Sequence, residues 1–298
     1  MERLLITLIL VCTMNNITNA QNPFYGQYHT PHEAVPFDRI ETEHYEPAIL
    51  EGIKLQNAEI EAIIQNPEKA DFTNTIEAFE ESGELLDKVV AVFGNMLSAE
   101  TNDDLQELAQ KIMPLLSEHS NNITLNKKLF ARVKEVYNQK ETLQLTEEQK
   151  QLLENAYNSF IRHGANLEGE AREEYRRLTT ELSKLTLTFS ENNLKETNAY
   201  QMLLTKKESL AGLPEIIIEA AAETAKNEEK EGWAFTLHAP SYIPFMTYSD
   251  NRDLRQKLYM AYNTKCTHDN EFNNIDIVKK IANTRMKIAQ LLGYKDYA

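Results

Sequence analysis

The sequence predicts a mainly α-helical protein in which two short strands form a small α/β insertion. Glycine and proline each occur nine times in 298 residues, whereas 26% of the residues are charged, and such a composition is typical of helix-rich proteins. Apolar residues recur at helical spacing along most of the chain. Two segments alternate instead with the period of two that is expected for a half-buried strand.

The helical periodicity is reinforced by signals at the predicted helix ends. Thr146 and Gln149 have the spacing of a capping box, Pro214 suits a first helical position, and Gly293 follows a last apolar turn as a stop signal. The predicted helices lie at about 46–66, 74–99, 102–118, 126–138, 147–163, 168–196, 214–230, 251–265 and 274–292.

The longest predicted helix, 168–196, carries an apolar seam that indicates packing against a neighbouring helix. Its members step by three and four residues: Tyr175, Leu178, Leu182, Leu185 and Phe189. After it, strands at Tyr200–Leu204 and Trp233–Leu237 flank the helix 214–230. These three elements predict a strand-helix-strand insertion at about 199–238, in a chain without solenoid repeats.

The segment after the second strand predicts two further helix starts. Pro240 ends the strand, Ser241 is placed to cap a helix, and Pro244 falls in the first turn, where a missing N–H donor costs little. A second helix is expected to begin near Asp250 or Asn251.

The first 20 residues predict a signal peptide. The apolar run from Leu4 to Cys12 is too short to span a bilayer but fits a signal-peptide core, and Thr18 and Ala20 are small residues spaced for cleavage before Gln21. The alternative is a buried N-terminal helix, because Glu2 offsets the charge of Arg3. Cleavage would leave residues 21–298 as an exported, periplasmic protein.

The charge of the chain excludes one large class of partners. The sequence has 46 acidic and 31 basic residues, a net charge of −15, and it contains neither a basic stripe nor a glycine-rich phosphate loop. Such a surface repels phosphate backbones. Nucleic acids and nucleotides are therefore not expected as ligands.

Several ordered motifs resemble one family of peptidases. The run G-W-A-F-T-L-H-A-P-S-Y-I-P-F-M-T-Y-S-D-N at 232–251 is similar to a W-x-(L/F)-T-L-x-x-P-S-Y-x-P-x-M-T-Y-x-x-N run in zinc metallopeptidases of the thimet oligopeptidase, oligopeptidase A and peptidyl-dipeptidase group. Further segments that resemble this family, in matching order, are Asn22–Phe24, Pro36–Asp38, Glu43–Ala48, Phe72–Ile76, Leu210–Glu215 and Ala289–Tyr294.

The resemblance implies a fold as well as an activity. In this family, two mostly helical lobes face each other across a deep channel that admits short peptides. The chain would then be the helical N-terminal region of such a peptidase, at 21–298, and supply much of one lobe. The aromatic segment Trp233–Tyr248 is a candidate for lying near the channel. The alternative is that its aromatic side chains belong to the hydrophobic core.

The zinc motif of the family is missing from this sequence. H-E-x-x-H supplies two imidazoles on one helical face, and its glutamate activates the metal-bound water. No two of the seven histidines are four residues apart, and the only His-Glu pair, His32-Glu33, is followed by Ala34, Val35 and Pro36. We therefore predict no catalytic, cofactor-binding or metal-binding residue here. The resemblance implies zinc in the intact family member, and none is expected on this chain.

The remaining candidate side chains have structural interpretations. His29 and His32 are three residues apart, but Pro31 between them favours an extended or turn segment with two solvated histidines over a metal site. His119 and His163 lie near predicted helix ends, where an imidazole suits the helix dipole. Cys266, the one cysteine left after export, is expected to be a packed or idle thiol.

Three hypotheses for function follow. The first is the N-terminal part of a zinc-dependent peptidase of the peptidyl-dipeptidase or oligopeptidase type, which cleaves short peptides only with a C-terminal catalytic lobe and is inactive alone. The second is a non-catalytic helical module that binds peptides or a partner. The third is a truncated product without a function of its own, which would expose an apolar face and aggregate.

Overall fold

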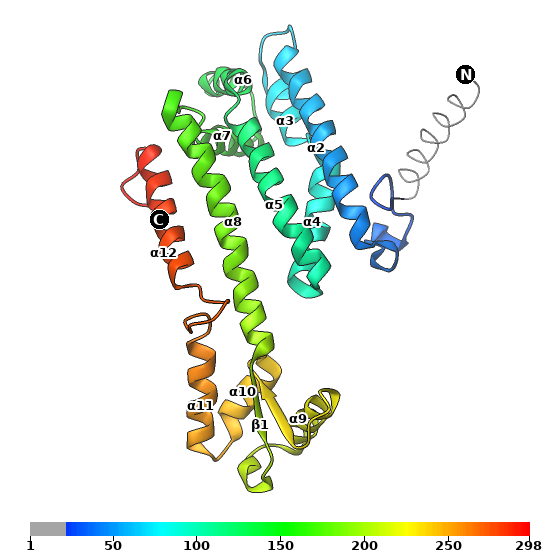
Figure 1. The fold of residues 1–298 in the computed structure, drawn as a ribbon. Helices are drawn as coiled ribbons and strands as arrows, with labels where there is room; N and C mark the ends of the chain where they lie inside the picture. Colours follow the sequence, from blue (N-terminus) through cyan, green and yellow to red (C-terminus); the bar gives the residue numbers. More distant parts are fainter. Residues whose placement is uncertain (1–21) are drawn as a thin grey trace, which may run out of the picture. The chain divides into compact units, whose positions relative to one another are not determined.

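The computed structural model describes residues 22–298, so the predicted signal peptide at 1–20 lies outside the described residues. The described chain is mainly α-helical with one small two-stranded sheet, which confirms the predicted fold class (Figure 1). It divides into two compact units. Unit 1 comprises the described residues up to Ser183 together with Lys287–Ala298, and unit 2 is Lys184–Met286. No described helix is both long and apolar enough to cross a bilayer.

Unit 1 is built from helices and short helical turns. A 3-10 turn at Pro31–Glu33, another at Phe37–Arg39 and a π-helical turn at Phe72–Glu77 accompany the longer elements. Its α-helices are α2 (Thr42–Gln65), α3 (Ala78–Glu80), α4 (Glu84–Ala99), α5 (Asp103–Thr124), α6 (Lys127–Asn138), α7 (Glu147–Arg162) and the first part of α8 (Gly169–Ala199). Helix α12 (Ile275–Leu291) begins in unit 2 and ends in unit 1.

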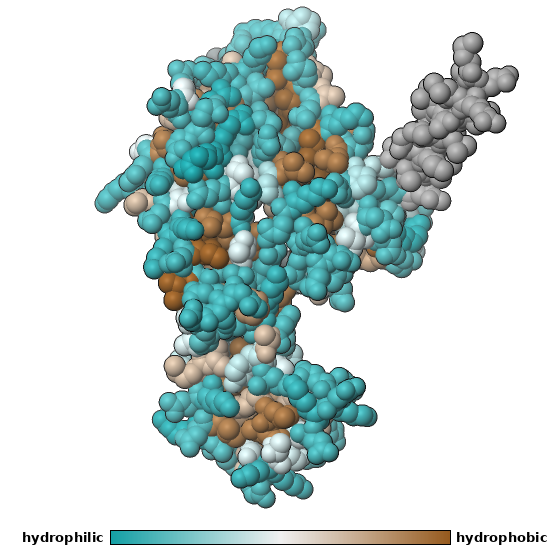
Figure 2. Space-filling model, viewed as in Figure 1, coloured by the Kyte–Doolittle hydropathy of each residue, from teal (hydrophilic) through white to brown (hydrophobic). Residues whose placement is uncertain are grey.

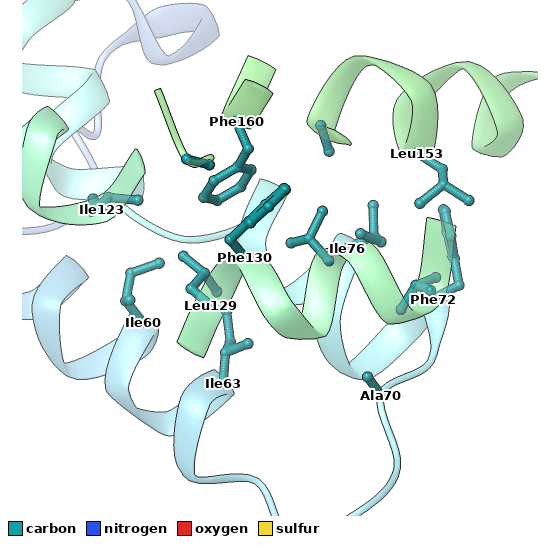
Figure 3. Close-up of a cluster of buried hydrophobic side chains, with 14 residues drawn as sticks. Ile60, Ile63, Ala70, Phe72, Ile76, Ile123, Leu129, Phe130, Leu153 and Phe160 are labelled. Atoms are coloured by element: carbon teal, nitrogen blue, oxygen red, sulfur yellow. The ribbon is translucent and has the colours of Figure 1, made fainter. Parts of the chain in front are cut away.

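The main core of unit 1 forms where α2, α6, α7 and the π-helical turn meet (Figure 3). Phe160 is 1% exposed, and its ring centre lies 5.7 Å from that of Phe130 and 5.4 Å from that of Phe79. Ile76 and Leu153 fill the same space and are fully buried. Burial of apolar surface at this centre stabilises the unit.

The seam predicted on the longest helix is confirmed at its beginning. Tyr175 and Leu178 of α8 are buried against Leu125 and against Ile288 of α12. Burial raises the pKa of the Tyr175 hydroxyl to about 12. The last predicted member of the seam, Phe189, is 39% exposed.

The predicted helix 74–99 is wrong because the chain breaks between α3 and α4. Gly83 has a φ of 87°, and a Cβ at this position would lie 2.4 Å from Nε2 of Gln56. Its amide N donates to Oε2 of Glu59, 2.8 Å away. Glycine is favoured where a left-handed backbone approaches another helix closely, and this tertiary contact is not visible in the apolar periodicity.

Two other helix boundaries differ from the prediction by four residues or more. Helix α2 begins at Thr42 instead of 46, because the backbone N of Glu41 donates to Nδ1 of His44 (2.9 Å) and completes a capping box. Helix α5 continues to Thr124 instead of ending at 118. The predicted capping box of Thr146 and Gln149 is present at the start of α7 and is confirmed.

Unit 2 contains the two predicted strands. Strand β1 (Gln201–Leu204) pairs antiparallel with β2 (Trp233–Thr236), so that Met202 lies opposite Phe235. Helix α9 (Glu215–Asn227) connects them, and α10 (Ala239–Tyr248) and α11 (Arg252–Asn263) follow. The sequence predicted Pro214 at the first position of this helix, but Pro214 is the N-cap of α9.

The helix start after β2 is also corrected. Helix α10 begins at Ala239 with Pro240 in its first turn, so Ser241 is not its N-cap and Pro244 lies inside the helix. The hydroxyl of Ser241 accepts instead from the backbone N of Thr236, 3.0 Å away. The expected next start is confirmed, because Asn251 caps α11 through the backbone N of Leu254 (3.1 Å).

Candidate functional site

The two N-terminal histidines lie in a tight turn. His29 and His32 have φ values of 53° and 58°, so the segment is a turn, as predicted, and not a regular helix. Both side chains are exposed. Across residues 22–298, no group of three or more His, Cys, Asp or Glu side chains is placed to hold a metal ion.

His119 and His163 make hydrogen bonds within unit 1. His119 lies inside α5 and not near its end, so the expected effect of the helix dipole does not apply. Its Nε2 is 2.6 Å from Oε1 of Gln56, and burial lowers its pKa below the usual 6.5. His163 is the C-cap of α7, with Nδ1 2.7 Å from the carbonyl O of Ser159. Both histidines make structural contacts, but only His163 lies at a helix end, as the sequence predicts.

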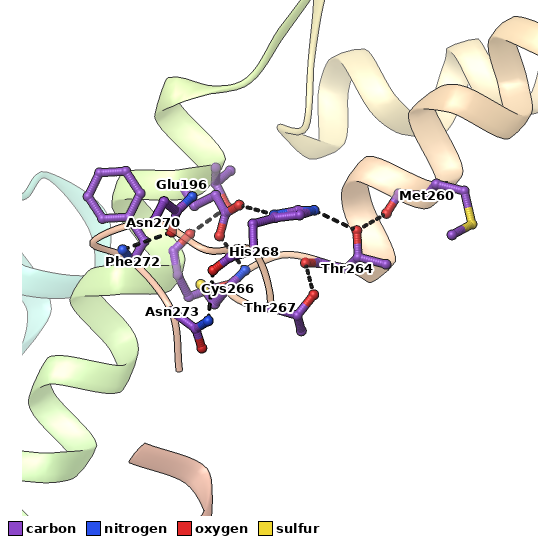
Figure 4. Close-up of polar contacts among 11 residues, drawn as sticks. Glu196, Met260, Thr264, Cys266, Thr267, His268, Asn270, Phe272 and Asn273 are labelled. Carbon is purple, nitrogen blue, oxygen red and sulfur yellow. Dashed lines mark hydrogen bonds and ion pairs between the residues drawn. The ribbon is translucent and has the colours of Figure 1, made fainter. Parts of the chain in front are cut away.

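One cluster in unit 2 brings a thiol, a carboxylate and an imidazole together (Figure 4). Glu196 of α8 accepts a hydrogen bond from the backbone N of Cys266 and lies 2.6 Å from Nδ1 of His268. The Glu196 side chain is only 12% exposed. Cys266 is buried and has a φ of 59°. The carboxylate thus holds the loop after α11 against α8.

The cluster does not have the properties of a nucleophilic site. Burial, with a further contribution from the hydrogen bond to Glu196, raises the pKa of the Cys266 thiol to about 11. A nucleophilic cysteine needs a lowered pKa and a base that can take its proton. The ring of His268 contacts Glu196 through Nδ1 and the Thr264 hydroxyl through Nε2 (3.3 Å). The structure therefore agrees with a packed, idle thiol.

Glu196 is the residue that sequence reasoning missed. It lies near the end of a long helix that is rich in charged residues, 70 positions before Cys266. No local pattern distinguishes it from the exposed glutamates of the same helix. Only an observed contact across the loop identifies it.

The aromatic segment proposed for the channel contributes mainly to the core of unit 2. Phe235 and Phe245 are fully buried, with ring centres 4.6 Å apart at 63°. Trp233 and Tyr242 are partly buried against the same cluster. The core interpretation is therefore correct for the two phenylalanines, whereas Tyr248, at the end of α10, is 52% exposed.

Unit 2 also exposes many large apolar side chains. Figure 2 shows apolar patches within a mostly hydrophilic surface, one of them in the lower part of the view, in the region of β1 and α10. On α10 to α12, the exposed residues are Ile243, Tyr248, Tyr259, Met260, Tyr262, Ile275, Val278 and Met286. Surfaces of this kind are typical of interfaces.

The donor groups of residues 22–298 do not fit a catalytic zinc site. Such a site needs three protein ligands and an open position for water. The sequence contains no H-E-x-x-H, and His268 contacts the carboxylate of Glu196 directly. We assign no zinc ligand to these residues.

The C-terminal segment of the chain is similar to a known peptidase family. Residues 245–298, from α10 to the last residue of the chain, match the sequence model of peptidase family M3. The mainly helical fold agrees with the resemblance drawn from the sequence motifs. The chain is a relative of the M3 peptidases.

Among the individual relatives are two bacterial peptidases. The chain is 36% identical over 278 residues to the dipeptidyl carboxypeptidase of Escherichia coli (strain K12), an alignment that covers 93% of this chain and 41% of that protein. It is 30% identical over 281 residues to oligopeptidase A of Salmonella typhimurium, with 93% and 41% covered. The chain thus spans about two fifths of the length of the curated relatives it matches.

Proposed function

We propose that this chain is the N-terminal part of a zinc-dependent peptidase of the peptidyl-dipeptidase or oligopeptidase A type, which hydrolyses short peptides. The observation that carries the proposal is the similarity over 93% of the chain to a dipeptidyl carboxypeptidase. The relatives named above are more than twice as long as the aligned region. The zinc ligands would then come from residues outside this sequence.

The chemistry of zinc-dependent hydrolysis supports a peptidase in which a separate catalytic part holds the metal and this chain does not. A zinc peptidase activates water on a metal held by two helical histidines and a carboxylate. The present chain has no such motif. It offers instead exposed apolar side chains such as Tyr259 and Met260 of α11 and Val278 of α12. We propose that these side chains contact the catalytic lobe of the peptidase.

The proposal also includes export. The apolar run from Leu4 to Cys12 fits a signal peptide, so we propose a periplasmic peptidase. Sequencing the N-terminus of the protein recovered from a periplasmic fraction tests this part. A start at Gln21 supports export, and a start at Met1 in a cytosolic fraction contradicts it.

The activity is tested with a short quenched fluorescent peptide. The purified chain alone is expected to give no zinc-dependent cleavage. A mixture with a family polypeptide that carries H-E-x-x-H is expected to cleave the peptide and to stop when a chelator is added. Turnover by the chain alone would show that it has its own catalytic site, and saturable peptide binding without turnover in the mixture would favour the non-catalytic module.

A further inference from the structure

A groove in unit 1 lies between the first halves of α2 and α5. It has a volume of about 920 Å³. Three apolar residues contribute to its lining, Pro47 and Leu50 from α2 and Leu108 from α5. The side chain of Leu50 is 46% exposed. Covering this surface would be favourable, at roughly 25 cal/mol per Å² of apolar area removed from water.

The groove also has an acidic lining. Four carboxylates, Glu43, Glu46, Asp104 and Glu107, line it together with a single basic residue, Lys111. Lys111 forms a salt bridge with Glu46, with 2.5 Å between Nζ and Oε1. Of the remaining carboxylates, Asp104 lies in the first turn of α5 and Glu43 in the first turn of α2, where the helix dipoles offset part of their charge.

Glu43 and Glu107 nevertheless have no basic partner among the described residues. Neither Glu43 nor Glu107 is in a salt bridge within the described part of the chain. The whole chain carries a net charge of −15, so an anionic partner would be repelled at this groove. A simple polyamine would neutralise the carboxylates but leave Leu50 uncovered.

We propose that this groove binds a short basic peptide segment. An aliphatic side chain of the segment covers Leu50, and flanking lysine or arginine side chains pair with Glu43 and Glu107. Charge complementarity selects the basic segment, and the apolar lining selects a peptide over a purely polar cation. The inference is independent of the proposed function, because binding requires no zinc and no turnover.

The test uses the full chain and a fluorescein-labelled, N-acetylated peptide of sequence K-L-A-L-K. Fluorescence anisotropy at low salt is expected to show saturable binding that weakens as salt is added. Two matched peptides separate the contributions. K-S-A-S-K keeps the charge without the leucines, and E-L-A-L-E keeps the leucines with the opposite charge. Both are expected to bind at least about tenfold more weakly, because each lacks one of the two contributions.

Variants of the groove locate the binding. The double variant Glu43→Gln/Glu107→Gln is expected to bind K-L-A-L-K about tenfold more weakly, because it loses two partly exposed ion pairs. The variant Leu50→Ser is expected to lose about as much, because it removes the exposed apolar side chain. Circular dichroism spectra should match those of the unmodified protein, since these side chains lie at the surface.

Control variants in α9 have the same chemistry outside the groove. Glu219→Gln/Glu223→Gln removes two exposed charges, and Ile216→Ser removes a side chain that is 72% exposed. Both controls are expected to bind within about twofold of the unmodified protein, since they touch no part of the groove. Equal weakening in the controls, unchanged binding in Leu50→Ser, or no binding of K-L-A-L-K would overturn the proposal.

Discussion

Replacing Phe245 by alanine tests whether the aromatic segment of unit 2 is a core or a binding surface. Phe245 is fully buried, and its ring meets that of Phe235 in a T-shaped contact with 4.6 Å between centres. If the segment is core, Phe245→Ala opens a cavity and destabilises unit 2. If the segment serves mainly to contact peptide, stability changes little.

The expected loss of stability can be worked out from this burial. A buried aromatic side chain removes roughly 150 Å² from water, which at about 25 cal/mol per Å² amounts to about 4 kcal/mol. The T-shaped contact contributes up to about 1 kcal/mol more. Measured Phe→Ala substitutions in cores cost about 3–5 kcal/mol. We therefore expect a loss of about 4 kcal/mol, a large fraction of the stability of a typical domain.

The assay is urea unfolding followed by tryptophan fluorescence. Trp233 is the only tryptophan and packs against the same cluster, so its emission reports on unit 2. Tyr248→Ala is the matched control, because this aromatic residue of the same helix is 52% exposed. Phe245→Leu, with an expected loss of about 1 kcal/mol, covers the case in which the alanine variant does not fold. Equal unfolding midpoints for Phe245→Ala and Tyr248→Ala would refute the reasoning.

Two further predictions follow from shifted pKa values. Burial lowers the folded-state pKa of His119 below 6.5, so stability should fall as the pH drops through 6.5 towards that folded-state pKa. The urea unfolding midpoints at pH 7.5 and pH 5.5 should therefore differ less in His119→Gln than in the unmodified protein. The pKa of the Cys266 thiol is raised to about 11. A Cys12→Ser protein, in which Cys266 is the one remaining cysteine, should therefore react slowly with a thiol reagent at pH 8. The double variant Cys12→Ser/Glu196→Gln should react faster. Equal pH dependence in the first pair, or equal thiol rates in the second, would contradict these assignments.

The features that the sequence predicted correctly depend on neighbouring residues. The capping box of Thr146 and Gln149 and the cap by Asn251 each need only three or four residues in order. The strands were predicted from alternation, but Ala234 of β2 is buried as well as Phe235. The small alanine can be buried on the face that the alternation assigns to solvent, and only the packing of unit 2 reveals this.

The features that were wrong depend on contacts that the local sequence pattern does not reveal. The break at Gly83 is set by Gln56 and Glu59 of another helix, although the apolar pattern on both sides is helical. Ser241 satisfies the sequence rule for an N-cap, yet its hydroxyl accepts from the strand residue Thr236. At Gly83 a tertiary hydrogen bond overrides the local preference, whereas Ser241 bonds to a residue five positions earlier in the chain. The local sequence pattern does not identify the partner in either case.

The cluster around Glu196 illustrates the same limit for candidate sites, and it bears on the proposed function. Cysteine, histidine and glutamate side chains together resemble a catalytic set in composition, but here the carboxylate contacts both other residues. Burial raises the pKa of the thiol, and the carboxylate adds to that shift. A catalytic arrangement would place the imidazole against the thiol and the carboxylate behind it. The geometry thus makes Glu196 a link between α8 and the loop after α11. If the chain is part of the zinc peptidase proposed above, this cluster would serve the packing of unit 2, and hydrolysis would depend on zinc ligands from the rest of that peptidase.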